Sequence, residues 1–220
     1  IMTDMSPSKV SRDIPRYGAL FVFAAGVLWS TVGLGIRFIE DAVVWQILFY
    51  RSISLSIFLF IVIRLRSGES PFVQVWRIGF PTVIAGLALV AAYAGGIYAI
   101  QATSVANAML LIATAPFIAA ILGLLVLAET VRRATWMAIT VAIFGIFIMF
   151  GDASGKVALS GSLAALGSAF GFAVFTVALR WGKSGDMLSS VFLSGIFAIC
   201  ITFAICQYLG LSMVLSARDG

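Results

Sequence analysis

One cation lies inside an apolar part of the chain and is the first candidate for chemistry. Arg51 belongs to the apolar run 43–63. It is about eight residues, hence about 12 Å, from the outer end of that run if the run is helical. Inserting an arginine near the centre of a bilayer costs about 2.5–3.5 kcal/mol, so it requires a partner or water. Two interpretations stay open: a cation that contacts a substrate carboxylate, or a structural arginine that reaches out to Glu40 or Asp41.

Two polar residues follow at helical spacing in a later apolar run. Asn107 and Thr114 are seven residues apart, which places them on one face of a helix. They line a cavity in one interpretation, and in the other they form hydrogen bonds between helices in lipid. Pro116 lacks a backbone donor, so it predicts a kink and frees a carbonyl near residue 112. The kink fits either a moving transport helix or simple packing.

Aromatic residues also occur away from the ends of the apolar runs. Trp29, Tyr93, Tyr98 and Phe175 are the candidates. Apolar and aromatic walls suit a cavity for amphipathic metabolites. The alternative is ordinary core packing, which is open for each of the four.

A carboxylate and two cations stand together where one apolar run ends. Glu129 is followed by Arg132 and Arg133. The sequence suggests either a structural pair at helical spacing or a gate contact at the cytoplasmic end of a transport pathway.

The sequence gives little support for enzymatic, metal-dependent or cofactor-dependent chemistry. The chain has no histidine, which removes histidine acid–base catalysis and the usual zinc, haem and copper ligand sets. Its two cysteines, Cys200 and Cys206, share one apolar run and indicate small core residues. With no nucleophile motif or carboxylate cluster, we expect no enzyme activity, no metal and no cofactor. The apolar runs also contain no Asp or Glu, which weakens a proton-antiport mechanism and favours a facilitated carrier.

These residues must be positioned by membrane-spanning helices. Of the 220 residues, 62% are hydrophobic and 10% are charged, against roughly 25% charged in a soluble domain. Seven runs are apolar and long enough to cross a bilayer: 18–38, 43–63, 78–99, 104–127, 134–150, 160–180 and 187–209. The third and fourth come from one charge-free stretch, which we expect to turn at Gln101, Thr103 and Ser104. The fold class is thus an all-α polytopic membrane protein.

Charge between the runs predicts orientation. Ten basic residues fall on one side: Lys9, Arg12, Arg16, Arg64, Arg66, Arg77, Arg132, Arg133, Arg180 and Lys183. Arg37, Lys156 and Arg218 fall on the other. This excess predicts a multi-pass protein of the cell membrane, the bacterial inner membrane, with a cytoplasmic N-terminus. Because the basic residues lie in short breaks between apolar runs, we expect no nucleic-acid partner. The expected partners are the lipid bilayer and a small-molecule substrate, and the sequence leaves the oligomeric state open.

The chain also repeats itself. Residues 18–37 resemble residues 161–180 at an offset of 143 residues, with Gly18 opposite Gly161 and Arg37 opposite Arg180. The two runs are expected to cross the bilayer in opposite senses, which is typical of the inverted repeats of transporters. We therefore expect a first five-helix unit at 18–150, an extracytoplasmic loop at 151–159, and the first two helices of a second unit at 160–220. Three further helices would complete ten.

The order of several motifs resembles the EamA type of the drug/metabolite transporter superfamily. The resemblance rests on the stretch from Gly95 to Gly151: Tyr98-Ala-Ile-Gln-Ala-Thr-Ser-Val-Ala-Asn-Ala-Met-Leu-Leu, Ala115-Pro116, Leu127-Ala-Glu129, Arg132-Arg-Ala-Thr-Trp136 and Gly145-Ile146. Trp29-Ser30 in the first run and Arg51 in the second fit as well.

The resemblance implies inverted five-helix units around a central substrate cavity. Its candidate lining residues are Trp29, Ser30, Arg51, Tyr93, Tyr98, Asn107, Thr114 and Phe175. The implied function is secondary transport, as a permease or exporter, of amino acids or amphipathic compounds by alternating access. The alternative is a seven-span receptor or sensor. The predicted cytoplasmic N-terminus and the lack of a lysine in the last run argue against it.

Overall fold

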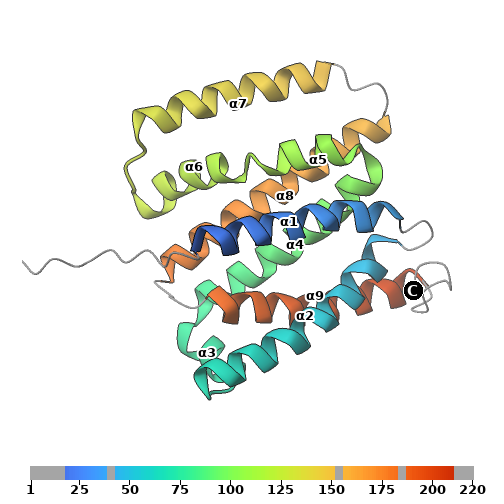
Figure 1. Ribbon diagram of the computed structural model, residues 1–220, viewed down its shortest axis with the longest axis vertical. Coiled ribbons are helices and arrows are strands. Elements are labelled where there is room, and N and C mark those ends of the chain that lie inside the picture. Colours follow the sequence, from blue (N-terminus) through green and yellow to red (C-terminus); the bar gives the residue numbers. More distant parts are fainter. Residues whose placement is uncertain (1–17, 39–42, 152–155, 183–186, 211–220) are drawn as a thin grey trace, which may run out of the picture.

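The computed structural model describes residues 18–38, 43–151, 156–182 and 187–210, and within them every regular element is a helix. The helices are α1 (Gly18–Phe38), α2 (Val44–Ser67), α3 (Pro71–Ile78), α4 (Phe80–Ala102), α5 (Val105–Ile112), α6 (Ala115–Leu127), α7 (Arg133–Gly151), α8 (Lys156–Trp181) and α9 (Met187–Tyr208). They lie side by side as a layered bundle (Figure 1). This confirms the all-α class.

Five segments are long and apolar enough to cross a membrane. They are α2, α4, α5 with α6, most of α8, and α9, each at least 22 residues long. A helix of that length spans about 30 Å, the thickness of the hydrocarbon core. The chain is therefore a polytopic membrane protein. The helices α1 and α7 coincide with the first and fifth predicted runs, and their crossing of the membrane stays a prediction.

The turn between the third and fourth predicted runs is confirmed. The helix α4 ends at Ala102, and Thr103 is extended, with φ near −140°. The next helix begins after Ser104, whose Oγ accepts a hydrogen bond from the backbone N–H of Asn107 at 3.2 Å. This cap satisfies one of the free donors at the helix start, and the chain reverses within the two residues Thr103 and Ser104.

The predicted run 104–127 is divided into α5 and α6 just before Pro116. Pro116 occupies the first turn of α6, where the missing N–H costs no intrahelical bond, and its role as a hinge stays a prediction. Thr114 Oγ1 donates to the carbonyl of Leu111 at 2.7 Å, and the backbone N–H of Thr114 donates to the same carbonyl at 3.1 Å. Both bonds satisfy the carbonyl of Leu111, in the last turn of α5.

The most intimate packing joins α4 to α8, which run antiparallel (Figure 1). A Cβ placed on Gly171 would lie 2.8 Å from the carbonyl oxygen of Ala88 and 2.9 Å from the Cβ of Ala92. A Cβ on Gly161, near the other end of the pair, would lie 3.0 Å from the Cβ of Thr103. Small residues thus let two backbones touch, which is how helices associate in lipid.

The helix α8 begins earlier than the predicted run 160–180. The range 151–159 was expected to be a loop, but α8 begins at Lys156. The residues 152–155 lie outside the described ranges. The helices α1 and α8, which carry the sequence repeat, run in opposite directions (Figure 1). Whether they are copies of one inverted unit stays a prediction.

The short helix α3 was not predicted, and it lies across the basic end of the bundle. Pro71 and Gln74 are its buried residues, and the Gln74 amide Nε2 donates to Ser67 Oγ at 2.7 Å while its Oε1 accepts from Ser189 Oγ at 2.8 Å. These bonds tie α3 to the end of α2 and the start of α9. Its opposite face exposes Phe72 and Trp76, the pattern of a helix that lies in a membrane interface.

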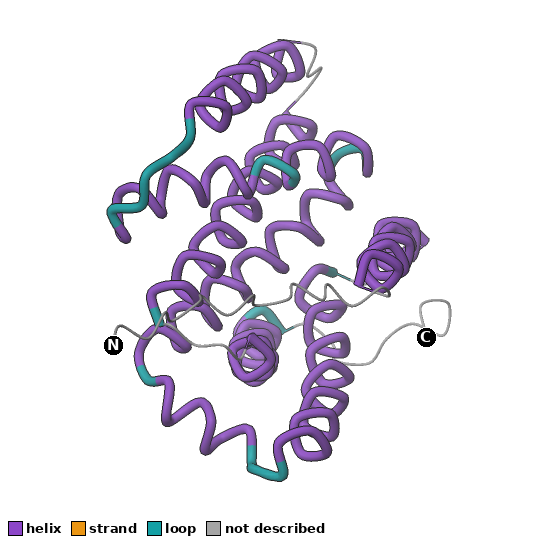
Figure 2. Tube along the Cα trace, turned by 60° about the vertical axis from the view of Figure 1, so that its left-hand side comes forward, coloured by secondary structure: helices purple, strands orange, loops and turns teal. Residues whose placement is uncertain are grey.

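The Cα trace in Figure 2 shows one helix set apart at the edge of the bundle, which is α7 of Figure 1. The pair α4 and α8 has the most extensive contacts, whereas α7 packs only loosely against α6. The buried core residues follow this arrangement: one cluster joins Ile97, Ile100 and Leu111 with Ala165 of α8. The core of the described chain is therefore centred on α4, which also forms one wall of the candidate site.

Candidate substrate cavity

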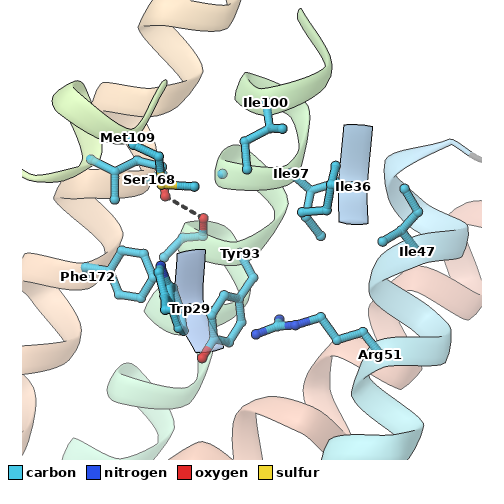
Figure 3. Close-up of a pocket in the computed structure, with 13 residues that line it drawn as sticks. Trp29, Ile36, Ile47, Arg51, Tyr93, Ile97, Ile100, Met109, Ser168 and Phe172 are labelled. Carbon is cyan, nitrogen blue, oxygen red and sulfur yellow. Dashed lines mark hydrogen bonds between the residues drawn. The ribbon is translucent and has the colours of Figure 1, made fainter. Parts of the chain in front are cut away.

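A cavity with a volume of about 90 Å³ lies between α1, α2, α4, α5 and α8 (Figure 3). Its lining residues are mostly large and apolar: Trp29, Ile36, Ile47, Arg51, Ala92, Tyr93, Gly96, Ile97, Ile100, Met109, Ile112, Ser168 and Phe172. A single water occupies about 10–15 Å³ by a comparable measure, so the space accepts a small organic group.

Helical spacing brings the α4 wall together. Tyr93, Gly96, Ile97 and Ile100 recur at intervals of three and four residues, so they share one face of α4. Across the cavity, Ile47 and Arg51 are four residues apart and share one face of α2. Both walls are therefore built on regular helices, which hold side chains more precisely than loops do.

Arg51 and Tyr93 meet face on at the edge of this cavity. The guanidinium carbon of Arg51 lies 3.8 Å from the centre of the Tyr93 ring, within the range of a cation–π interaction (Figure 3). The Tyr93 ring in turn meets Phe172 edge on, with ring centres 5.7 Å apart and planes at 84°. The contact with Phe172 holds the tyrosine ring in place, and the ring holds the guanidinium.

Arg51 is the single charged residue among those that line the cavity. Over the described part of the chain, the ion pairs are Arg77 with Glu69 and Arg180 with Glu129, and neither involves Arg51. The acids that the structural interpretation invoked, Glu40 and Asp41, lie outside the described residues. The cavity therefore carries a half-buried positive charge whose neighbours are an aromatic face and aliphatic side chains.

The polar side chain that α8 contributes to the cavity wall already forms a hydrogen bond. Ser168 is fully buried, and its Oγ donates to the carbonyl oxygen of Ala92 at 2.7 Å (Figure 3). This bond crosses from α8 to α4 in the tightly packed region. The Ser168 hydroxyl proton is therefore not available to a ligand.

Three of the eight residues predicted to line a cavity meet here, namely Trp29, Arg51 and Tyr93. Ser30 lies next to Trp29 on α1, and its hydroxyl donates to the carbonyl oxygen of Val27 at 2.7 Å. Tyr98 lies further along α4, where its hydroxyl is 3.4 Å from Ser160 Oγ. Ser30 and Tyr98 are both outside the lining set.

Phe175 packs in the core instead of the cavity. It is 6% exposed and lies in a cluster with Ala85, Leu89 and Ala178. The aromatic residue of α8 that does line the cavity is Phe172, about one turn earlier. The sequence shows phenylalanines at both positions, four and seven residues after Ser168, so helical spacing alone does not distinguish them.

Asn107 and Thr114 form hydrogen bonds within and between helices. The Asn107 amide Nδ2 donates to Thr103 Oγ1 at 3.2 Å and to Ser162 Oγ at 3.1 Å on α8. Thr114 is buried, and its hydroxyl bonds to Leu111 as described above. Neither residue lines the cavity, so the packing interpretation describes their contacts.

Glu129 finds its partner on a different helix from the one expected. Arg180 Nη1 donates to Glu129 Oε2 at 2.5 Å, and Nη2 is 3.5 Å from the carbonyl oxygen of Ala119. Arg132 and Arg133 are exposed, and neither forms the ion pair with Glu129 in the described residues. The pairing at helical spacing is therefore replaced by a contact that joins the end of α6 to the end of α8.

The contact between Glu129 and Arg180 depends on a residue whose backbone is in the left-handed region. Ala128 has φ 52° and ψ 30°, and the backbone N–H of Glu129 then donates to the carbonyl oxygen of Gly123 at 3.3 Å. This closure is a common way to end a helix. It turns the Glu129 carboxylate back over Gly123, where a Cβ would lie 3.1 Å from Oε2. The partner Arg180 was missed because no local pattern connects residues 51 positions apart.

Comparison with known proteins gives one match. A family model described as the EamA-like transporter family matches residues 16–151, which is more than half of the chain. No curated protein and no solved structure matches the chain. The matched range contains every helix that lines the cavity except α8.

Proposed function

The chain belongs to the EamA-like transporter family, within the drug/metabolite transporter superfamily, and from this premise we propose that it moves small metabolites by alternating access through the cavity at Arg51 and Tyr93. Members of this family are membrane transporters rather than enzymes, which supports a transport function for this chain. The observation that carries the mechanism is the cavity itself, enclosed by side chains from α1, α2, α4, α5 and α8.

Alternating access requires contacts that close one end of the cavity and can separate. The pair Glu129–Arg180 supports such a gate, because it joins α6 to α8 at one end of the bundle. Both side chains are about 40–45% exposed. An exposed pair of this kind contributes only about 0.2–1 kcal/mol, so it breaks and reforms readily. The break at Pro116 supports movement of α6 relative to α5.

The basic end of the bundle is proposed to be cytoplasmic. Within the described chain, Arg64, Arg66, Arg77, Arg132, Arg133 and Arg180 all belong to helix ends or connections on this side. An excess of arginine and lysine is the usual mark of the cytoplasmic face. The N-terminal residues would then also be cytoplasmic, and the Glu129–Arg180 contact would close the inner side.

The rival function, a receptor or sensor, differs from a transporter in one measurable respect. A transporter opens its cavity to both sides of the membrane in turn, whereas a receptor has no need to do so. Family membership does not favour the receptor. Access to Met109, which lines the cavity on α5, separates the two functions without knowledge of the substrate.

The experiment uses one reporter cysteine. Cys200 and Cys206 are replaced by alanine, Met109→Cys is introduced, and a membrane-impermeant maleimide is added to sealed right-side-out or inside-out vesicles. The transporter proposal predicts labelling from both sides. Trp76→Cys is the matched control, because this 90% exposed residue of α3 lies at one end and reacts from one side only. Labelling of Met109→Cys from only one side, after exhaustive reaction, contradicts alternating access.

A further inference from the structure

We infer that the cavity selects apolar monocarboxylate anions over zwitterions and amines with the same carbon skeleton. Arg51 is the carboxylate-binding residue, and Tyr93 positions its guanidinium. This inference names the substrate class of the proposed transporter and so rests on the proposed function. It follows from the charge, the geometry and the walls of the cavity.

The charge of the cavity favours a single negative charge. Arg51 is positive, and no Asp or Glu occurs among the thirteen lining residues. An uncompensated charge in an environment of low dielectric constant is costly. A monocarboxylate brings the total to zero. A zwitterionic amino acid leaves it at plus one and finds no carboxylate for its ammonium group, and an amine raises it to plus two.

The geometry leaves the binding edge of the guanidinium available. The Tyr93 ring covers one face of the group at 3.8 Å. The N–H donors of a guanidinium point outward in its plane, so stacking does not occupy them. No hydrogen bond from Arg51 to another residue is found in the described chain. A carboxylate in the guanidinium plane accepts two parallel hydrogen bonds, the strongest arrangement that these groups form.

The remaining walls suit an apolar skeleton. The Trp29 indole and the side chains of Ile36, Ile97 and Ile100 surround the space (Figure 3). The Ser168 hydroxyl proton is bonded to the Ala92 carbonyl, so it is not available to a ligand. The Trp29 N–H and the Tyr93 hydroxyl are the polar groups that remain on these walls, so a ligand with several hydroxyl or amide groups would lose more hydrogen bonds to water than it regains. Aromatic or branched aliphatic carboxylates are therefore the ligands that fit.

Three ligands with one phenyl ring test the charge argument. They are phenylpyruvate, which is a monoanion, L-phenylalanine, which is a zwitterion, and phenethylamine, which is a cation. Binding to the full chain in lipid nanodiscs is measured by calorimetry. Hydrogen bonds to charged groups contribute about 1.5–3 kcal/mol, so we expect phenylpyruvate to bind about 10- to 100-fold more tightly than L-phenylalanine, and phenethylamine not at all.

Variants assign the preference to residues. Arg51→Gln is expected to weaken phenylpyruvate binding at least about tenfold and to remove the preference over L-phenylalanine. Tyr93→Phe keeps the ring and retains the preference, whereas Tyr93→Leu weakens it. Arg77→Gln is the matched control: this arginine pairs with Glu69 outside the cavity, and its loss leaves binding unchanged. Each variant is first checked for wild-type thermal unfolding.

The outcomes are decisive in either direction. Equal or tighter binding of L-phenylalanine, no binding of any of the three ligands, or wild-type phenylpyruvate binding by a folded Arg51→Gln variant overturns the inference. If Arg51→Gln does not fold, the order of the three ligands on the wild-type protein still decides it. Selective binding without flux in sealed vesicles contradicts the transporter proposal alone, and flux without charge preference contradicts this inference alone.

Discussion

The two sides of α4 differ in how closely the neighbouring helices approach it. Toward α8 the contact residues are small, and Gly171 brings the α8 backbone against Ala88 and Ala92. Toward α1 and α2 the side chains are large, and Tyr93 and Arg51 meet across a cavity. One helix thus carries a closed interface on one face and an open site on another.

This difference indicates that the size of the side chains between two helices decides whether the helices pack closely or leave a cavity. Water is absent from the bilayer core, so the hydrophobic effect does not draw helices together there. Small residues permit backbone contact and close van der Waals packing. A stacked arginine and tyrosine need room for two planar groups, so they hold their helices apart. The closed α4–α8 pair then acts as the support for the open side.

The largest expected effect comes from adding one methyl group to the closed interface. Gly171→Ala places a Cβ 2.8 Å from the Ala88 carbonyl oxygen, so the helices must separate. Such overpacking costs about 1–3 kcal/mol. Unfolding of the purified protein in detergent with increasing dodecyl sulfate measures the loss.

Gly167 provides the matched control for this substitution. It lies about one turn from Gly171 on α8, and a Cβ there meets nothing within 4 Å. Gly167→Ala is expected to leave stability unchanged or to raise it by up to about 1 kcal/mol through helix propensity. Equal losses for the two variants would show that α4 and α8 are not in backbone contact at Gly171.

A smaller effect is expected from adding bulk on the open side. Met109 lines the cavity, so Met109→Phe directs its ring into existing space. We expect a loss of stability below about 1.5 kcal/mol, less than that of the single methyl group at Gly171, together with weaker phenylpyruvate binding. A loss larger than that of Gly171→Ala, measured in the same unfolding assay, would mean that the cavity is filled by protein.

The smallest effect belongs to the contact that joins the two regions at the basic end. Glu129 and Arg180 are both partly exposed, so their pairing is expected to contribute about 0.2–1 kcal/mol. A double-mutant cycle of Glu129→Gln and Arg180→Gln, followed by unfolding, measures this coupling. The cycle Glu129→Gln with Arg77→Gln, whose residues are not paired with each other, serves as the control and should give none.

Much of the fold follows from the sequence because its signals are local. Apolar length predicts the helices, a lipid environment demands that polar turns be capped, and Pro116 breaks the helix that contains it. The helix α3 was not predicted because its eight residues are too few to cross a membrane and include the charged Arg77. The signals that were available are Ser70 before Pro71 at its start and Gly79 at its end.

The site is harder to predict because no local sequence pattern shows which face of each helix is turned toward the cavity. Most of α8 is small or apolar on every face, so the sequence does not indicate whether Phe172 or Phe175 faces the cavity. Arg51 was identified because one charge within an apolar run is costly anywhere in lipid. Arg180 was missed as the partner of Glu129, because the contact depends on the left-handed Ala128 and on how α6 packs against α8.

The central claim is that the cavity transports an apolar carboxylate bound by Arg51. Its most direct test is exchange of labelled phenylpyruvate into sealed proteoliposomes that are preloaded with unlabelled phenylpyruvate. Protein-free liposomes give the background, and Arg77→Gln is the control variant. We predict rapid uptake by the wild type and by Arg77→Gln, at least about tenfold slower uptake by Arg51→Gln, and competition by excess phenylpyruvate but not by L-phenylalanine. Uptake by wild type at the rate of protein-free liposomes, or equal uptake by a folded Arg51→Gln variant, would contradict the account.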